Sequence, residues 1–428
     1  MEQEILVSSI SSGGKHTDKT LINPFDLLLC KSRIWVTVTG SSMVNVYSYS
    51  GKLESAISIQ SPTGICLSEN GHREHKRDSI PDKKRSYASD SGQCNVECND
   101  KVIFVGSMNG NVYKLVTGST PQIYVSPGGN VMGIATLNGK LYVAIQSLST
   151  TVNTMSGMAV NTTTNTTSVR GVIYVYNANN HPVHPVQMNQ ATTLVPEKRL
   201  MDTDLAIAGY QPYGLKAIGG YLYITWSPPS VTLNTMNAST STTNTSNTSI
   251  SSIMSSCKQG FGYVSVYDPE CDRLVRIINR SNLSSPYGIV SPSISDYRKR
   301  YTDLAERLYI GNKGTGSISI FSSSNSRSNS KQTNCKYSYM RDVSTPYGGI
   351  LVNDGLMGMD IHRKSGDIYF VAAIDNGNMG LLGIMYTSDK YNDLHSTSCS
   401  SSSSSDDFSD SCSDSRGGRW RNHDTLPY

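Results

Sequence analysis

Long hydrophobic runs, phenylalanine, tryptophan and an excess of charge are all scarce in this sequence of 428 residues. Hydrophobic residues make up only 37% of it, which is low for a globular protein. No window reaches the ~18 apolar residues that a membrane-spanning helix needs, so we expect no membrane span. The formal net charge of +4 is small for this length and argues against nucleic acid as the main partner.

The N-terminal sequence lacks the pattern of a secretion signal. The segment MEQEILVSSISSGG has two glutamates among its first four residues and neither a basic region nor an apolar stretch, so we expect a protein that is not classically secreted. The nine cysteines are odd in number, which without a signal does not indicate a disulfide framework. Cys30 and Cys66 lie in strand-like runs and are interpreted as small buried hydrophobic residues.

Tyrosine is abundant instead, and a short motif recurs along the chain. The 25 tyrosines favour half-buried strands. In the motif, a proline is typically followed two residues later by a glycine and then by an apolar run. Proline suits the start of a strand, and glycine lets two backbones approach closely, as the crowded inner edge of a radial structure requires. The glycines at this structural turn are Gly64, Gly133, Gly214, Gly288 and Gly358, and Asp26 takes the place in the first copy.

Each of the six copies is followed by further strand-like runs. A second and a third run follow every copy, and several copies have a fourth. The spacing from Pro24 to Pro62 is 38 residues, close to the ~40–45 of a propeller blade. The sequence therefore predicts an all-β fold: a six-bladed β-propeller of four-stranded antiparallel blades over residues 1–388. We expect the strand Glu4–Ile10 to complete the last blade, which begins near Met357.

These motifs resemble a family of six-bladed propellers with NHL-like blades. The resemblance rests on stretches such as INPFDL, SPTGI, MGIATLNGKLYVA, YQPYGLKAIGGYLYITW and SPYGIV, and it spans roughly residues 5–388. Members of that family are known mainly as uncharacterised bacterial proteins, so the resemblance implies a fold and no reaction. Phe25-Asp26 departs from the Trp-Gly that the family has at this turn. The Ser- and Asn-rich insertions also resemble those of proteins encoded by giant viruses of amoebae.

Low-complexity insertions interrupt the repeat without splitting a predicted strand. Their composition cannot bury enough apolar area to offset chain entropy, so we expect loops there. The C-terminal residues 389–428 are expected to be a disordered Ser- and Asp-rich tail. Its basic-aromatic end, Arg416, Arg419, Trp420 and Arg421, is a candidate docking peptide for another protein. The insertions cover about 68–100, 147–169, 227–258, 291–306 and 322–346.

One insertion holds a candidate metal site. Its ligands would be His72, His75, Cys94 and Cys98, four nitrogen and sulfur ligands that could close a tetrahedral zinc site. A Cys94–Cys98 disulfide and no bond at all are the alternatives, and the absence of a bond is favoured. We therefore expect no cofactor and keep zinc open.

Catalytic motifs are missing elsewhere. Only His362 among the eight histidines falls within a strand-like unit, and no Gly-X-Ser-X-Gly elbow or complete phosphate loop occurs. We therefore expect a non-enzymatic protein-interaction or structural scaffold, in a giant-virus particle or the infected-cell cytoplasm, with other proteins as partners. The alternative is a metal-dependent, lactonase-like hydrolase with its site in the channel. Residues near strand starts that could face such a channel are Asp26, Asp204, Asp360 and Asn130.

Overall fold

The computed structural model describes ten stretches of the chain. They are residues 1–11, 13–30, 32–68, 102–116, 118–146, 171–178, 194–228, 260–292, 304–323 and 336–386. All of them belong to one unit, Met1–Ser388, and the remaining unit, Asp389–Tyr428, lies outside the described residues.

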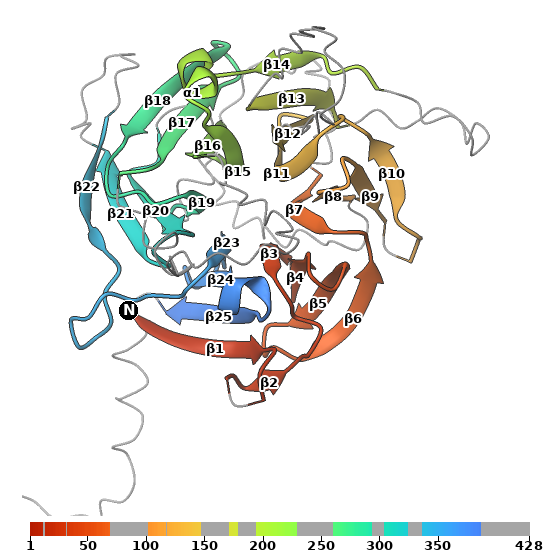
Figure 1. Cartoon of the computed structure of the whole chain (residues 1–428), viewed down its shortest axis with the longest axis vertical. Helices are drawn as coiled ribbons and strands as arrows, with labels where there is room; N and C mark the ends of the chain where they lie inside the picture. Colours follow the sequence, from red (N-terminus) through yellow and green to blue (C-terminus); the bar gives the residue numbers. More distant parts are fainter. Residues whose placement is uncertain are drawn as a thin grey trace, which may run out of the picture. The chain divides into compact units, whose positions relative to one another are not determined.

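The described strands form six sheets that follow one another around a ring (Figure 1). The innermost strand of every sheet contacts the innermost strands of both neighbouring sheets. The predicted all-β, six-bladed β-propeller is therefore confirmed. The first three blades consist of β3 (Pro24–Cys30), β4 (Arg33–Val38), β5 (Met43–Ser48) and β6 (Leu53–Ser58), then β7 (Pro62–Leu67), β8 (Ile103–Ser107), β9 (Val112–Leu115) and β10 (Gln122–Val125), then β11 (Asn130–Leu137), β12 (Lys140–Gln146), β13 (Val172–Asn177) and β14 (Lys198–Leu200).

The other three blades have the same antiparallel order. Blade four is preceded by the short helix α1 (Thr203–Ile207), and blade six contains the 3₁₀ helix η2 (Asp375–Gly377). These blades consist of β15 (Gln211–Ile218), β16 (Tyr221–Ser227), β17 (Tyr263–Asp268) and β18 (Arg273–Asn279), then β19 (Pro286–Val290), β20 (Arg307–Asn312), β21 (Ile318–Ser323) and β22 (Tyr337–Asp342), then β23 (Leu356–Ile361), β24 (Ile368–Ala372), β25 (Leu381–Tyr386) and the N-terminal β1 (Glu2–Ser8).

The N-terminal strand closes the ring, as the sequence predicted. β1 pairs antiparallel with β25, with a register that runs from Glu2 opposite Tyr386 to Ser8 opposite Leu381. A two-residue strand, β2 (His16–Thr17), then adds to β1 in parallel, so that blade six has five strands. Because β1 pairs with β25, β25 is not an exposed edge strand of blade six.

The core of the propeller is divided among the six blade interfaces. Five of the six hydrophobic clusters draw their residues from two neighbouring blades, for example Trp35 and Val44 of blade one with Val105 of blade two, and the sixth joins blades six and one with inner-strand residues of three further blades. The middle strands are consequently buried on both faces, as the pattern of β4 shows, where five of six residues are buried. This is why the second strands read as continuous apolar runs in the sequence.

Three blades begin with the same turn. The residue before the proline has a left-handed backbone, with φ of 50° at Asn23, 44° at Ser61 and 49° at Ser285. Its carbonyl accepts a hydrogen bond from the residue that follows the second strand, which joins the blade start to the hairpin behind it. The donors are the backbone N–H groups of Thr39, Met108 and Lys313, at 3.1, 3.0 and 3.1 Å.

Three features differ from the sequence-based expectation. β22 lies inside the range 322–346 that was assigned to an insertion, because an exposed outer strand has no apolar alternation to reveal it. The helix α1 was not predicted. Cys30 is buried but also forms a disulfide, and its partner lies outside the described residues. The other predicted insertions and the tail fall almost entirely outside the described residues.

Candidate site at the propeller axis

Side chains from five inner strands fill the axis of the ring. Each stands one residue before the repeated glycine position, and all five are buried in one cluster. Tyr287 of β19 stacks edge-on against Phe25 of β3, with ring centroids 5.1 Å apart, although blade six separates their blades. Contacts of this kind must cross the axis. We call this set the axial plug: Phe25, Met132, Tyr213, Tyr287 and Met357.

Two further contacts hold the axial plug together. Tyr213 packs edge-on against Tyr287, with centroids 5.7 Å apart. The Tyr287 hydroxyl donates a hydrogen bond of 3.3 Å to the backbone carbonyl of Met132, two blades away. Burial raises the pKa of Tyr287 well above its ordinary value, so the hydroxyl keeps its proton and remains a donor.

The repeated glycines lie where neighbouring inner strands meet. A Cβ atom built on Gly64 would stand 2.8 Å from the backbone nitrogen of Ile134, and one built on Gly288 would stand 2.7 Å from the carbonyl of Met357. Gly133 and Gly214 are crowded even more closely by the backbone of the next blade, and Gly358 is crowded by Asp26. Each glycine therefore allows one inner strand to press against the next.

Asp26 occupies the sixth of these positions and connects three blades. Its carboxylate accepts hydrogen bonds from the backbone N–H of Leu27 at 2.9 Å and from that of Ile65, in blade two, at 3.2 Å. A Cβ built on Gly358 of blade six would lie 2.6 Å from the Asp26 Cα. The side chain thus replaces the direct backbone contact that a glycine makes elsewhere in the ring.

The position of Asp26 perturbs its titration. The residue keeps some accessible surface, yet protein atoms surround its carboxyl, and desolvation raises its pKa from 3.8 to about 7. The positive charge of Lys216 and the two backbone hydrogen bonds lower this pKa, and the negative charge of Asp360 raises it. Desolvation prevails, so the group gains or loses its proton near neutral pH.

An ion pair spans the axis beside Asp26. The Lys216 ammonium on β15 lies 2.7 Å from Oδ1 of Asp360 on β23, and blade five separates the two strands. Both side chains are largely buried, with 23% and 11% of their surfaces exposed. Asp360 is held from its other side as well, because Oδ2 accepts from the backbone N–H of Leu29 at 2.9 Å. The carboxylate of blade six therefore has partners from two other blades, and its contacts connect three blades.

The structure brings together two of the four residues that the sequence offered for the channel. Asp26 and Asp360 both lie at the axis, whereas Asn130 begins β11 opposite Gln146. Lys216 was missed, since a single lysine in an apolar strand gives no signal of its own. It stands two residues after Gly214, as Asp360 stands two residues after Gly358, and this shared place in the repeat could have identified it.

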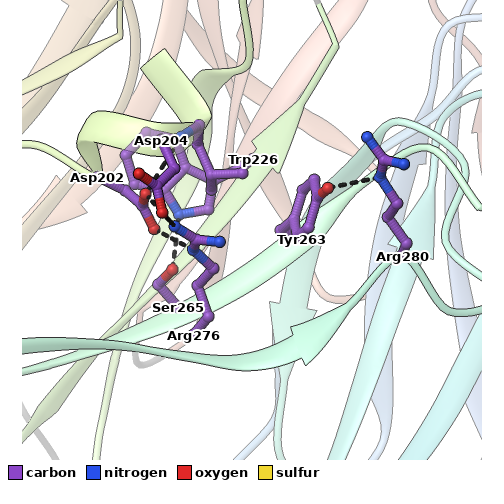
Figure 2. A network of polar contacts seen from close by, with 8 residues as sticks. Asp202, Asp204, Trp226, Tyr263, Ser265, Arg276 and Arg280 are labelled. Atoms are coloured by element: carbon purple, nitrogen blue, oxygen red, sulfur yellow. Dashed lines mark hydrogen bonds and ion pairs between the residues drawn. The ribbon is translucent and has the colours of Figure 1, made fainter. Parts of the chain in front are cut away.

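Asp204 lies away from the axis, so its assignment to the channel was wrong. It belongs to α1, and Figure 2 shows it with Asp202 beside Arg276 of the outermost strand β18. The Arg276 guanidinium contacts Asp202 at 2.5 and 2.7 Å and Asp204 at 2.6 Å. Asp202 also caps α1 by accepting from the Leu205 N–H at 3.2 Å. This network fastens α1 to the blade edge.

The remaining candidate residues lie outside the described part of the chain. They are the possible zinc ligands His72, His75, Cys94 and Cys98 and the tail residues Arg416, Arg419, Trp420 and Arg421. Within the described stretches, no group of three or more His, Cys, Asp or Glu residues is arranged to hold a metal ion. None of the helices in those stretches is long and apolar enough to cross a membrane.

Comparison with known proteins relates the chain to giant-virus proteins. No family model matches it. An uncharacterised protein of Acanthamoeba polyphaga mimivirus is 23% identical over 392 residues, covering 88% of this chain and 83% of that protein. A second uncharacterised protein of the same virus is 21% identical over 390 residues, covering 88% and 78%.

Solved structures are similar as well, and one of them illustrates the level of similarity. It is a crystal structure of a proposed oxidoreductase (glucose dehydrogenase) from Thermus thermophilus, with a TM-score of 0.45 and 12% identity, and the match covers 90% of this chain and 99% of that one. The chain is thus a six-bladed propeller that is similar, at low identity, to uncharacterised mimivirus proteins.

Proposed function

We propose that this propeller is a non-enzymatic scaffold that binds other proteins in a giant-virus particle, or at its assembly site in the infected-cell cytoplasm. The observation that carries the proposal is the occupation of the axis by the chain's own side chains. The axial plug fills one level, and Asp360 has its lone pairs engaged by Lys216 and by backbone N–H groups. A ring closed in this way offers its rims and outer strands to partners.

Two further observations support the viral scaffold. The mimivirus relatives match over most of their own length, so the likeness concerns the whole propeller. The blade turns also keep the motifs that resemble NHL-like repeats, and we propose that the blades belong to that class. The basic-aromatic end of the tail, with Trp420 between Arg419 and Arg421, would add a docking peptide.

Quantitative mass spectrometry of purified particles tests this proposal. Particles of the virus that encodes the protein would be separated from infected-cell lysate on a density gradient, with a viral enzyme of the cytoplasm as the control. The scaffold proposal predicts that the protein is enriched with the particles relative to that control. A protein found only in the soluble cytoplasmic fraction, with no cross-links to particle proteins, would contradict it.

The alternative is a metal-dependent hydrolase with its site in the channel. The pair Asp26 and Asp360 supports this alternative, because carboxylates are ligands of hard cations. Lys216 already supplies a positive charge to this pair, and a carboxyl with a pKa of about 7 is a poor ligand at neutral pH. Hydrolysis of lactones or phosphate esters that requires an added divalent cation and is lost in Asp360→Asn would establish the alternative.

A further inference from the structure

The charged residues at the axis form a set that the scaffold proposal does not require. Lys216 comes from blade four, Asp360 from blade six and Asp26 from blade one, and no two of them adjoin in the chain. Most ion pairs of the described residues are at the surface, for example Lys140 with Glu197, whose side chains are 37% and 43% exposed. An ion pair across the axis is more buried, so solvent screens it less.

The surroundings of Asp26 can be described strand by strand. β15 contributes the Lys216 ammonium, β23 contributes the Asp360 carboxylate and β19 contributes the neutral Tyr287 hydroxyl. The neighbouring strand β7 presents the backbone N–H of Ile65, and β3 presents that of Leu27. Tyr49 follows β5. Its pKa is raised mainly by burial, and the negative charge of Asp360 raises it further. The Lys216 ammonium is therefore paired with one carboxylate and acts electrostatically on a second.

We propose that Lys216, Asp360 and Asp26 form a proton-operated clasp across the axis. In both protonation states Lys216 ties blade four to blade six through Asp360. When Asp26 is ionised, it draws the same ammonium toward blade one, and the clasp then joins three blades. When Asp26 is protonated, its carboxyl is neutral, and the Lys216–Asp360 pair is the only charged contact of the set. The propeller thus has two charge states at its centre, which interconvert near neutral pH.

Carbon-13 NMR of the full chain, labelled at aspartate, tests the clasp without any need for a destabilised variant. The Asp26 signal is assigned as the one lost in Asp26→Asn. In the native protein it should titrate with a midpoint of about 7, far above the ordinary 3.8. Titration near the ordinary value would overturn the proposal, since Asp26 would then be ionised throughout and could not switch.

Removal of the ammonium distinguishes a shared lysine from simple burial. In Lys216→Met the Asp26 midpoint should rise by about one unit or more, because a nearby opposite charge has been lost. In Asp360→Asn the midpoint should fall, because a like charge has been lost. Lys140→Met is the matched control and should leave the midpoint unchanged. An Asp26 midpoint that is unchanged in Lys216→Met would show that the lysine does not stabilise the ionised form of Asp26.

A double-mutant cycle in urea unfolding tests whether the clasp switches. The coupling between Lys216 and Asp26 should change the unfolding equilibrium constant by about 5- to 10-fold at pH 8.5 and vanish at pH 5.5. The coupling between Lys216 and Asp360 should remain at both pH values. A Lys216–Asp26 coupling that is equal at the two pH values would contradict a proton-operated clasp.

Discussion

At the scale of single residues, the ring depends on positions that have no room for a side chain. The glycine of blade five is an example, because a Cβ on Gly288 would meet two backbone atoms of β23, the Met357 carbonyl at 2.7 Å and the Met359 nitrogen at 3.1 Å. Backbone atoms cannot rotate away as a flexible side chain can. The neighbouring blade would have to move, and with it the axial plug.

Gly288→Ala should therefore destabilise the propeller by about 2–3 kcal/mol, the cost of overpacking a well-filled site. Urea unfolding followed by tyrosine and tryptophan fluorescence measures the change. Gly349→Ala is the matched control, since the nearest atom to its Cβ is the Thr345 hydroxyl oxygen at 3.6 Å and the residue is exposed. Equal stability of the two variants would mean that the inner strands are not closely apposed.

Asp26 gives a prediction about pH. The native state holds the Asp26 proton up to about pH 7, and an unfolded aspartate releases it near 3.8. Between these values the native state binds more protons, so the contribution of Asp26 to stability is full below the lower pKa and is lost as pH rises through the upper one. Asp26→Asn should remove this loss and make the protein more stable than the native form at pH 8.

The size of that gain has an upper bound. Each pKa unit corresponds to ~1.4 kcal/mol, so the full shift of Asp26 bounds the gain at ~4 kcal/mol, and the accessible surface that the residue keeps reduces it. Urea unfolding at pH 5 and pH 8 measures the gain and its decrease at the lower pH, which still lies above the pKa of the unfolded aspartate. If the native protein and Asp26→Asn lost stability in parallel between pH 5 and pH 8, another group would control the pH response.

The glycine pattern was readable at this scale, but the role of Asp26 was not. Glycines recur because at each blade the backbone of the next inner strand lies where a Cβ atom would be. A structural unit that repeats in the fold therefore also repeats in the sequence. The sequence places Asp26 at the blade turn and offers it for the channel, but it does not predict that the residue connects three blades. Its perturbed titration follows from the closure of the ring and from Lys216, 190 positions away in a different blade, which no local pattern encodes.

At the scale of elements, α1 is held to blade four by a few side chains. The helix has only five residues, too few to be stable by itself. Asp202 caps its first turn and forms a bidentate pair with Arg276, while Leu205 is its only buried side chain. Docking to β18 therefore determines whether α1 forms.

Asp202→Ala should release α1, because the substitution removes the cap and two charge-assisted hydrogen bonds together. The expected local cost is about 1–2 kcal/mol. Hydrogen exchange of the amides of Leu205 and Ala206 measures it, since both should exchange about tenfold faster or more. Asp204→Ala should have little effect, as the Asp204 side chain is 80% exposed. Protection that survives in Asp202→Ala would assign the docking to Leu205 instead.

Inner and outer strands differ in how well the sequence reveals them. The second strands are buried on both faces and read as apolar runs, and the first strands start at the repeated turn. The outer strand β22 has mostly exposed or half-exposed residues, and β14 has only three residues. Their pairing is imposed by the third strand of the blade, so sequence alone gave them no distinctive pattern.

At the scale of the whole molecule, closure of the ring depends on the N-terminal strand. β1 supplies the fourth strand of blade six and buries Leu6 and Val7 in the interface with blade one. Deletion of residues 1–9 should cost at least a few kcal/mol, since two buried aliphatic side chains and a row of hydrogen bonds are lost. It should also expose β25 as an edge that promotes aggregation.

Calorimetry and light scattering of the deletion variant measure both effects. A synthetic peptide of residues 1–9, added in excess, should raise the unfolding temperature again. Removal of residues 389–428 is the control and should leave that temperature unchanged, because the propeller is contained in Met1–Ser388. An unchanged unfolding temperature after the N-terminal deletion would mean that β1 is not needed to close the ring.

The most direct test is a crystal structure of the protein soaked with manganese or calcium, with anomalous diffraction recorded for the metal. It should show Phe25, Tyr213 and Tyr287 in contact at the axis, Lys216 paired with Asp360, and no anomalous peak between the two carboxylates. A metal ion bound by Asp26 and Asp360, with Lys216 turned away, would contradict an axis occupied by the protein's own side chains.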